Sequence, residues 1–192
     1  MRVTGGRWRG RTLRPVKGSA VRPTTDMVRQ ALFNILGGAV DGAEVADLCC
    51  GSGALGIEAL SRGAARVTFV DVAPVSLAAT RANLRDCGAD PSAWRAVRGD
   101  AARWLDRRLA AAADPPLLVL ADPPYGGDAL RAVAAVLAAA DPTRVSVAVL
   151  EHAPGDAPVA GLAGWNTDTR VYGNTALTIL RPRAAEPPEA SP

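Results

Sequence analysis

From residue 44 onward, short apolar runs alternate with helical patterns, and this alternation constrains the fold more than any other feature. The apolar runs have the length of buried strands, and most of the longer segments between them have helical periodicity or helix boundary signals. The alternation predicts strands over 44–48, 66–71, 94–100, 117–122 and 145–151, and helices over 53–63, 75–88, 101–112 and 128–140. Strands that alternate with helices build a mostly parallel sheet with helices on both faces, so we expect an α/β fold.

The two ends of the chain depart from this alternation. Residues 169–180 hold two alternating runs around Gly173-Asn174, which is typical of a hairpin, so the last two strands are expected to be antiparallel to each other. Residues 22–36 predict a helix that follows a Thr-Thr-Asp cap region. We therefore expect a basic arm or hairpin over 1–21, the main domain over 22–183 and a Pro-rich, disordered tail over 184–192.

Composition excludes several classes of protein. Hydrophobic residues make up 48% of the 192 residues, which is too many for a disordered chain. No apolar run reaches the roughly 18 residues that a membrane span needs, and no signal peptide is visible at the start. Three cysteines and one histidine give neither a disulfide framework nor a familiar metal-ligand spacing. We expect a soluble, cytoplasmic protein with no bound metal.

Positive charge is concentrated at the N-terminus. Residues 1–30 contain eight basic residues and one acidic residue, a formal charge of +7, whereas the whole chain carries only +3. A solvated face is the ordinary explanation of such a run, but here the arginines alternate with glycines and a tryptophan and have almost no acidic partners. This pattern favours a surface for nucleic acid, with Arg7, Trp8, Arg9 and Arg11 as the candidate contacts.

The segment GSGALG, residues 51–56, matches G-x-G-x-x-G, which is weak evidence by itself. Three aspartates at predicted strand ends strengthen it. Asp47 can hold a cationic amino group, Asp71 can accept both hydroxyls of a ribose, and Asp100 can accept a hydrogen bond from an adenine amine. Each aspartate also has a purely structural explanation. Asp47 and Asp100 could cap a helix or loop, and Asp71 could be a turn residue at the end of a strand. The remaining candidate cofactor contacts are Gly51, Ser52, Gly53, Val72 and Ala101.

The segment LADPPYGG, residues 120–127, follows the fourth predicted strand and belongs to the same edge. Pro123 and Pro124 fix the backbone, end the strand and leave carbonyl oxygens without local donors. Asp122 adds an acceptor side chain, and Tyr125 adds a ring on which a base can stack. These four candidate catalytic residues suit the exocyclic amine of a nucleobase, whereas a lone Pro-Pro-Tyr is usually an ordinary turn.

Together these motifs resemble the class I S-adenosylmethionine-dependent amino-methyltransferases. That group has a D-x-x-x-G-x-G turn, an acidic end of the second strand, an aspartate after the third strand and a [DN]-P-P-[YFW] motif, in this order. The segments RVTGGRWRGRTL, RPTTDMVRQALFNIL, DLCCGSGALGIEALSRGAARVTFVD and ADPPY are further similar to the RsmD family, over most of residues 2–152, and so is RVYGNTALTIL. Cys49-Cys50 and Ala73-Pro74 depart from the residues common in that family.

The resemblance implies a Rossmann-like methyltransferase domain over 22–183 and S-adenosylmethionine as the cofactor. It also implies methyl transfer to the exocyclic N2 of one guanine in 16S ribosomal RNA. The partner would be 16S rRNA or the small ribosomal subunit, and we expect the protein to act as a monomer. On this interpretation Asp122 and the Pro123 carbonyl accept the N–H groups of the base, and Tyr125 stacks on it.

Three alternatives stay open from the sequence. An adenine-N6 methyltransferase acting on DNA or RNA would use the same cofactor site. A dehydrogenase would share only the glycine turn and Asp71. A non-catalytic RNA-binding assembly factor would not need the cluster from Asp122 to Tyr125. His152, which follows the fifth predicted strand, is expected to be a hydrogen-bonded structural residue without a catalytic role.

Overall fold

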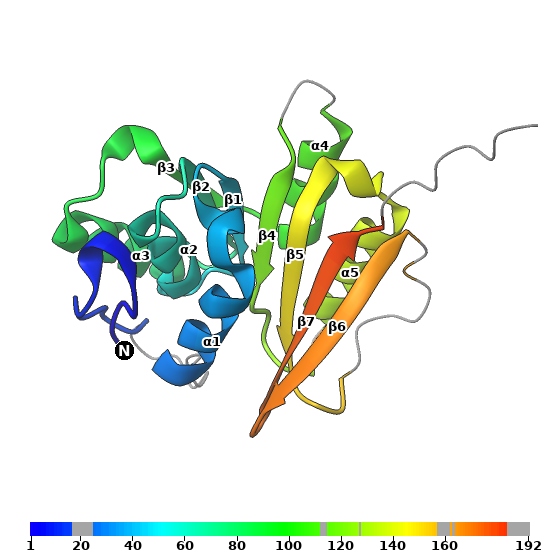
Figure 1. The fold of residues 1–192 in the computed structure, drawn as a ribbon. Helices are drawn as coiled ribbons and strands as arrows, with labels where there is room; N and C mark the ends of the chain where they lie inside the picture. Colours follow the sequence, from blue (N-terminus) through cyan, green and yellow to red (C-terminus); the bar gives the residue numbers. More distant parts are fainter. Residues whose placement is uncertain (17–24, 112–114, 127, 157–161, 163, 184–192) are drawn as a thin grey trace, which may run out of the picture.

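The computed structural model describes residues 1–16, 25–111, 115–126, 128–156, 162 and 164–183. These residues form a seven-stranded sheet of order β3-β2-β1-β4-β5-β7-β6 (Figure 1). Strands β1 to β5 pair in parallel, and β7 is antiparallel to both β5 and β6. The strands are β1 (Glu44–Leu48), β2 (Arg66–Asp71), β3 (Trp94–Arg98), β4 (Leu117–Ala121), β5 (Val145–His152), β6 (Trp165–Tyr172) and β7 (Thr175–Pro182). The predicted parallel sheet with an antiparallel C-terminal hairpin is confirmed.

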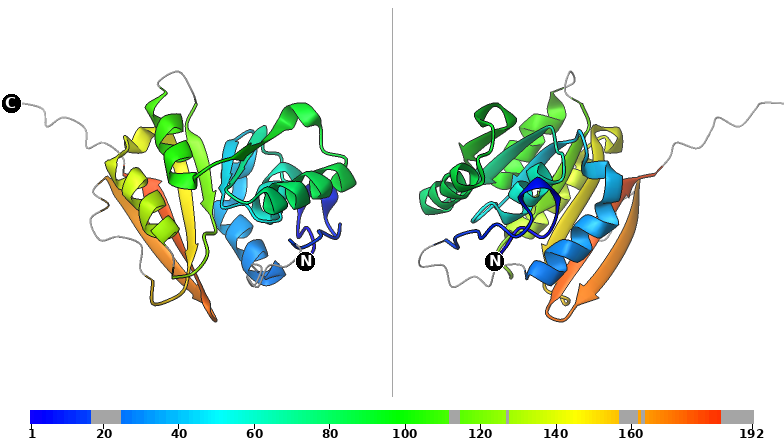
Figure 2. Two further views of the ribbon diagram at one scale, coloured as in Figure 1. Left: turned by 180° about the vertical axis from the view of Figure 1, so that it is seen from behind. Right: turned by 60° about the vertical axis from the view of Figure 1, so that its left-hand side comes forward.

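Helices cover both faces of the sheet, as predicted, and Figure 2 shows the two layers from behind and from the side. Buried side chains of α1 (Asp26–Leu36), α2 (Ala54–Ser61) and α3 (Pro74–Cys87) belong to one hydrophobic cluster. Those of α4 (Ala101–Ala110) and α5 (Asp128–Ala139) belong to the other. Four short 3₁₀ helices complete the described elements: η1 (Gly6–Trp8), η2 (Gly37–Val40), η3 (Pro91–Ala93) and η4 (Pro142–Arg144).

Local chemistry explains where the elements begin and end. Helix α1 begins at Asp26 because the hydroxyl of Thr25 accepts the Val28 N–H at 3.3 Å. Helix α3 ends at Cys87, and the next residue, Gly88, has a φ of 69°, the left-handed conformation typical of the position after a helix. Strand β3 ends at Arg98, two residues earlier than predicted, because Gly99 leads into the Asp100 cap of α4.

The basic N-terminal segment folds as a hairpin, here named the arginine hairpin (residues 1–14). Arg2 bridges Thr12, the Val3 N–H donates to the Arg11 carbonyl at 2.9 Å, and the Leu13 N–H donates to the Met1 carbonyl at 3.0 Å. Its side chains Val3, Trp8 and Leu13 are buried in the same cluster as α1, α2 and α3. The hairpin therefore shares the core of the domain. The predicted boundary at residue 21 and the predicted tail over 184–192 lie outside the described residues.

A buried ion-pair network fastens the arginine hairpin to α1 and α2. Glu58 of α2 is fully buried and accepts the backbone N–H and the hydroxyl of Thr4, both at 2.7 Å, and the Arg62 Nε at 2.8 Å. Arg29 of α1, also fully buried, lies 3.5 Å from Glu58 and pairs with Asp26 at 2.8 Å. Removing one partner of such a network leaves a buried charge uncompensated, so these contacts fix where the hairpin sits.

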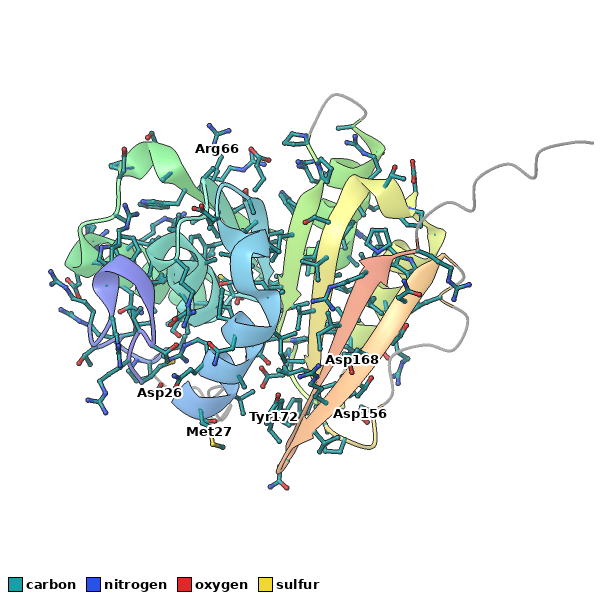
Figure 3. All side chains as sticks on the ribbon, in the orientation of Figure 1. Asp26, Met27, Arg66, Asp156, Asp168 and Tyr172 are labelled. Carbon is teal, nitrogen blue, oxygen red and sulfur yellow. The ribbon has the colours of Figure 1, made fainter. Side chains whose placement is uncertain are left out.

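The carboxyl ends of the parallel strands lie together at one edge. In Figure 3, Arg66 at the start of β2 is at the top, whereas Tyr172 at the end of β6 and Asp156 after β5 are at the bottom. Loops at this edge carry the predicted site residues.

Among the described residues, no helix is long and apolar enough to span a membrane.

Candidate active site

A cleft of about 560 Å³ opens at this edge of the sheet, between the loops that follow β1, β2, β3 and β4. It is the kind of crevice in which open α/β sheets bind ligands. Nine of the residues predicted from the sequence line it: Asp47, Gly51, Ser52, Asp71, Val72, Asp100, Ala101, Asp122 and Pro124. The fold therefore brings together most of the candidate cofactor residues and two of the candidate catalytic residues.

The glycine turn after β1 holds three left-handed residues in a short space. Cys49, Gly51 and Gly53 have φ values of 57°, 53° and 80°. Glycine adopts this region at little cost, whereas Cys49 is the only non-glycine residue with positive φ in the described chain. The turn is held from outside, since the Thr80 hydroxyl donates to the Gly51 carbonyl at 2.9 Å. Gly53 does not line the cleft, and a Cβ there would lie 2.8 Å from the Thr80 methyl.

Gly56, the last glycine of the fingerprint, serves helix-to-sheet packing. A Cβ at this position would lie 2.3 Å from Phe69 Cε1 and 2.8 Å from Val67 Cγ1. Both residues belong to β2 and are fully buried. The glycine therefore allows α2 to lie directly on the sheet, and it says nothing about which ligand the turn holds.

Asp47 is buried at the end of β1 and caps α2. Its Oδ2 accepts the Gly56 N–H at 2.8 Å, which is the capping contact left open by the sequence. Burial raises the pKa of Asp47 well above its usual range, and the negative charges of Asp122 and Asp71 raise it further. Asp47 also lines the cleft. A positively charged group there would favour the ionised carboxylate, so the position suits a cationic ligand.

Asp71 and Asp100 each have a backbone contact in addition to their place in the cleft. Asp71 accepts the Gly51 N–H at 2.9 Å and the Ala73 N–H at 2.8 Å, so it ties the glycine turn to the end of β2. Asp100 accepts the Arg103 N–H at 2.9 Å and caps α4. A carboxylate has about four lone-pair sites, so both residues keep acceptor capacity for a ligand.

The Asp-Pro-Pro-Tyr segment turns at the end of β4 beside β1. The Asp122 N–H donates to the Leu48 carbonyl at 3.3 Å, which places this aspartate next to the glycine turn. Pro123 is buried, and Pro124 lines the cleft. Tyr125 does not line the cleft, although half of its surface is exposed.

The hydroxyl of Tyr125 points to the neighbouring strands. It lies 3.1 Å from Thr175 Oγ1 at the start of β7 and 3.4 Å from Glu151 Oε1 in β5. Burial raises the pKa of Tyr125, so the phenol stays protonated at neutral pH. The ring is thus held at its hydroxyl end beside the cleft, and a stacking role for its face stays a prediction.

Four aspartates make the cleft acidic. Burial raises the pKa of Cys49 to about 12, and the charges of Asp71, Asp122, Asp47 and Asp100 contribute to the rise. The thiol at the base of the cleft is therefore protonated at neutral pH and is a weak nucleophile.

The arginine hairpin exposes its charged side chains but buries its tryptophan. Arg7, Arg9 and Arg11 are exposed, and Arg11 donates to the Asp86 carbonyl at 3.2 Å. The structure buries Trp8, and its predicted contact with nucleic acid stays a prediction. Its side chain is only 8% exposed, packs in the core, and is covered by the Arg7 guanidinium 4.2 Å from the ring centre. Its backbone N–H donates to Ser61 Oγ of α2 at 2.9 Å, which fixes this position.

Several cleft residues carry no recognisable sequence signal. Met1, Pro15 and Val16 reach the cleft from the N-terminal segment, and Ala129 and Ala132 reach it from α5. Small or apolar residues in these positions belong to no motif. Met1, Pro15 and Val16 come near the glycine turn because the N-terminal segment packs on α1, α2 and α3.

His152 is buried outside the cleft. Its ring nitrogens lie 2.8 Å from Thr178 Oγ1 and from the Ala153 carbonyl, in agreement with the structural role expected for it.

Comparison with known proteins identifies relatives over most of the chain. Residues 1–181 match a family model described as conserved hypothetical protein 95. The chain is 40% identical over 134 residues to YlbH of Bacillus subtilis (strain 168), which is 69% of this chain and 71% of that protein. It is 38% identical over 125 residues to ribosomal RNA small subunit methyltransferase D of Escherichia coli (strain K12), which is 65% of this chain and 60% of that protein.

A solved structure, that of yhhF from Escherichia coli, superposes with a TM-score of 0.76 at 30% identity, covering 96% of this chain and 99% of that chain. The chain therefore belongs to the conserved hypothetical protein 95 family, which is the RsmD family that its motifs resemble.

Proposed function

We propose that this protein is an S-adenosylmethionine-dependent methyltransferase that methylates the exocyclic N2 of a guanine in 16S rRNA. The observation that carries the proposal is the convergence of Asp47, Asp71, Asp100 and Asp122 on one cleft beside the glycine turn. The name of the Escherichia coli relative, a ribosomal RNA small subunit methyltransferase, supports the RNA substrate.

The residues of the cleft fit the cofactor. Asp47, a buried carboxylate with a raised pKa, suits the cationic amino group of the methionine part. Asp71 would accept the ribose hydroxyls, Asp100 would accept the adenine amine, and the backbone of Gly51 and Ser52 would lie along the ligand. When bound, the cofactor supplies an electrophilic methyl group. A dinucleotide fits less well, because its pyrophosphate at the glycine turn would lie beside the Asp47 carboxylate and be repelled by it.

The candidate catalytic residues suit a guanine. Its N2 is a poor nucleophile because the lone pair is delocalised into the ring, so the protein must orient the base and accept its protons. The Asp122 carboxylate and the Pro123 carbonyl would accept N–H groups, and guanine offers donors at both N1 and N2. The base has to leave its stack to reach Asp122, and Tyr125 offers a ring beside the cleft on which it would rest.

The protonated Cys49 thiol is compatible with this chemistry. With a pKa of about 12, it does not compete with the base for the methyl group. Outside the cleft, Arg7, Arg9 and Arg11 would bind RNA phosphates without reading sequence. We further propose that the enzyme acts as a monomer in the cytoplasm, on 16S rRNA or the small ribosomal subunit.

The test compares Asp122→Ala with a matched control. We expect Asp122→Ala to bind S-adenosylhomocysteine within a few-fold of the wild-type affinity in calorimetry and to lose methyl transfer to 16S rRNA. Asp106→Ala, at an exposed position of α4 outside the cleft, should keep both properties. Transfer by Asp122→Ala at the wild-type rate would remove the proposed role of this aspartate. Tight binding of NAD with no response to S-adenosylhomocysteine would overturn the proposed function itself.

A further inference from the structure

A single buried amide, that of Asn83 in α3, joins the glycine turn to the N-terminal segment. Asn83 is fully buried. Its Nδ2 donates to the Ser52 carbonyl at 2.9 Å and to the Arg14 carbonyl at 3.0 Å, while its Oδ1 accepts the Arg14 N–H at 2.9 Å. The two acceptors and the one donor around it fix the orientation of the amide.

One partner of Asn83 lines the cleft, and the other directly precedes two residues that line it. Ser52 lines it from the glycine turn, and Pro15 and Val16, which follow Arg14 directly, line it from the N-terminal segment. These two parts of the wall are 36 or more residues apart in sequence. The views of Figures 1 and 2 show the N-terminal segment lying against α2 and α3, and the Arg14–Asp86 ion pair at 2.9 Å adds a second contact to α3.

Arg14 is the last residue of the arginine hairpin, so the Asn83 contact also holds the hairpin. Hydrogen bonds from the Val3 and Leu13 N–H groups to the Arg11 and Met1 carbonyls make residues 1–14 one unit. The hairpin has a separate anchor on α2, where Ser61 Oγ accepts the Trp8 N–H at 2.9 Å and donates to the Gly5 carbonyl at 2.6 Å. The Asn83 contact reaches the cleft, whereas the Ser61 contact, like those of Glu58 and Arg29 described above, does not.

We propose that Asn83 is a positioning residue that couples occupancy of the cleft to the placement of the arginine hairpin. A ligand that packs between Ser52 and Val16 restrains both partners of the Asn83 amide, and through Arg14 it restrains the hairpin. Coupling of this kind is reciprocal, so a polyanion held by the arginines tightens binding in the cleft by the same factor. The inference rests on the proposed function, because it takes S-adenosylmethionine and RNA as the two ligands.

The experiment combines calorimetry with hydrogen exchange on the full chain. Asn83→Ala removes three hydrogen bonds, and we expect it to weaken S-adenosylhomocysteine binding about tenfold, the loss expected for one or two hydrogen bonds of ordinary strength. In the wild-type protein, S-adenosylhomocysteine should slow exchange of the Val3, Leu13 and Arg14 amides. In Asn83→Ala this slowing should vanish.

Two further variants keep the test decisive. Asn83→Asp has nearly the same size and keeps the acceptor for the Arg14 N–H, but its ionised carboxylate donates neither bond. It should therefore lose affinity and the slowing of exchange like Asn83→Ala. Ser61→Ala releases a hairpin anchor on α2 that does not reach the cleft. We expect it to leave the affinity for S-adenosylhomocysteine within twofold of wild type and to keep the slowing at Arg14.

The outcomes separate the two proposals. If wild-type protein binds S-adenosylhomocysteine but ligand leaves the hairpin amides unchanged, the coupling is refuted and the proposed function stands. Wild-type affinity in folded Asn83→Asp also refutes it, and so does an equal loss of affinity in Ser61→Ala. If the wild-type protein does not bind S-adenosylhomocysteine at all, both the proposed function and the coupling fail.

Discussion

Replacing Gly56 with alanine tests whether this glycine packs α2 against the sheet. The added Cβ would lie 2.3 Å from Phe69 Cε1 and 2.8 Å from Val67 Cγ1, far inside normal contact distance. Neither side chain has room to withdraw, since both are fully buried on β2, which is paired on both sides. The overpacking cost should therefore be about 3 kcal/mol, the upper part of the usual range.

Helix propensity works in the opposite direction. Alanine is a better helix former than glycine by about 1 kcal/mol, so the net loss in the free energy of unfolding should be about 2 kcal/mol. For a domain of this size, that loss lowers Tm by about 4–8 °C. Urea unfolding at 25 °C and thermal unfolding followed by circular dichroism measure both quantities.

Two partner variants make the reasoning refutable. Gly38→Ala, in η2, meets no atom within 4 Å and has no positive φ, so its stability should stay within about 0.5 kcal/mol of wild type or rise slightly. Phe69→Leu removes the ring that the methyl group added by Gly56→Ala would strike, so the double variant should be more stable than the sum of the single effects by about 1–2 kcal/mol. Wild-type stability in Gly56→Ala, or strict additivity in the double variant, would refute the packing role.

Three further predictions concern Asp47, Glu58 and Tyr125. The pKa of Asp47 is higher in the folded protein than its ordinary value near 3.8. As pH rises from that ordinary value to the folded-state pKa, Asp47 should therefore lower the free energy of unfolding of the wild-type protein. Asp47→Asn keeps an acceptor for the Gly56 N–H but does not titrate, so urea unfolding measured across pH should no longer show this fall. An unchanged pH dependence in Asp47→Asn would contradict the prediction. Glu58→Ala should lose about 3–5 kcal/mol in the same assay, since it breaks the pair with Arg29; a loss below about 1 kcal/mol would show that the pair is dispensable. Tyr125→Phe keeps the ring, so it should keep kcat within a few-fold and raise KM for RNA. Tyr125→Ala removes the ring, so it should lower both kcat and kcat/KM. Equal kinetic constants in the two variants would remove the stacking role.

The sheet and most of the cleft follow from the sequence because parallel strands place their carboxyl ends at one edge. Asp47, Asp71, Asp100 and Asp122 each stand at or just beyond a predicted strand end, and the topology alone brings them together. Gly56 could likewise be assigned to packing from its position in the helix. These inferences need only local patterns and the handedness rules of α/β units.

Other features depend on contacts between distant residues, which local patterns do not encode. Trp8 is buried because Ser61, 53 residues away, holds its backbone against α2. The direction of Tyr125 is set by Thr175, 50 residues away on a strand that the hairpin brings next to β5. Val16 and Pro15 enter the cleft wall because Asn83 holds Arg14, 69 residues away.

The central claim is methyl transfer to a guanine of 16S rRNA, and the identity of the modified nucleoside tests it most directly. Purified protein is incubated with S-adenosylmethionine labelled in its methyl group and with 16S rRNA or small ribosomal subunits that lack the modification. The RNA is then digested to nucleosides and analysed by mass spectrometry. We expect label in N2-methylguanosine, and none with Asp122→Ala. Label in N6-methyladenosine would show that the enzyme modifies adenine, and no label in either RNA preparation, with active cofactor present, would contradict the proposed activity.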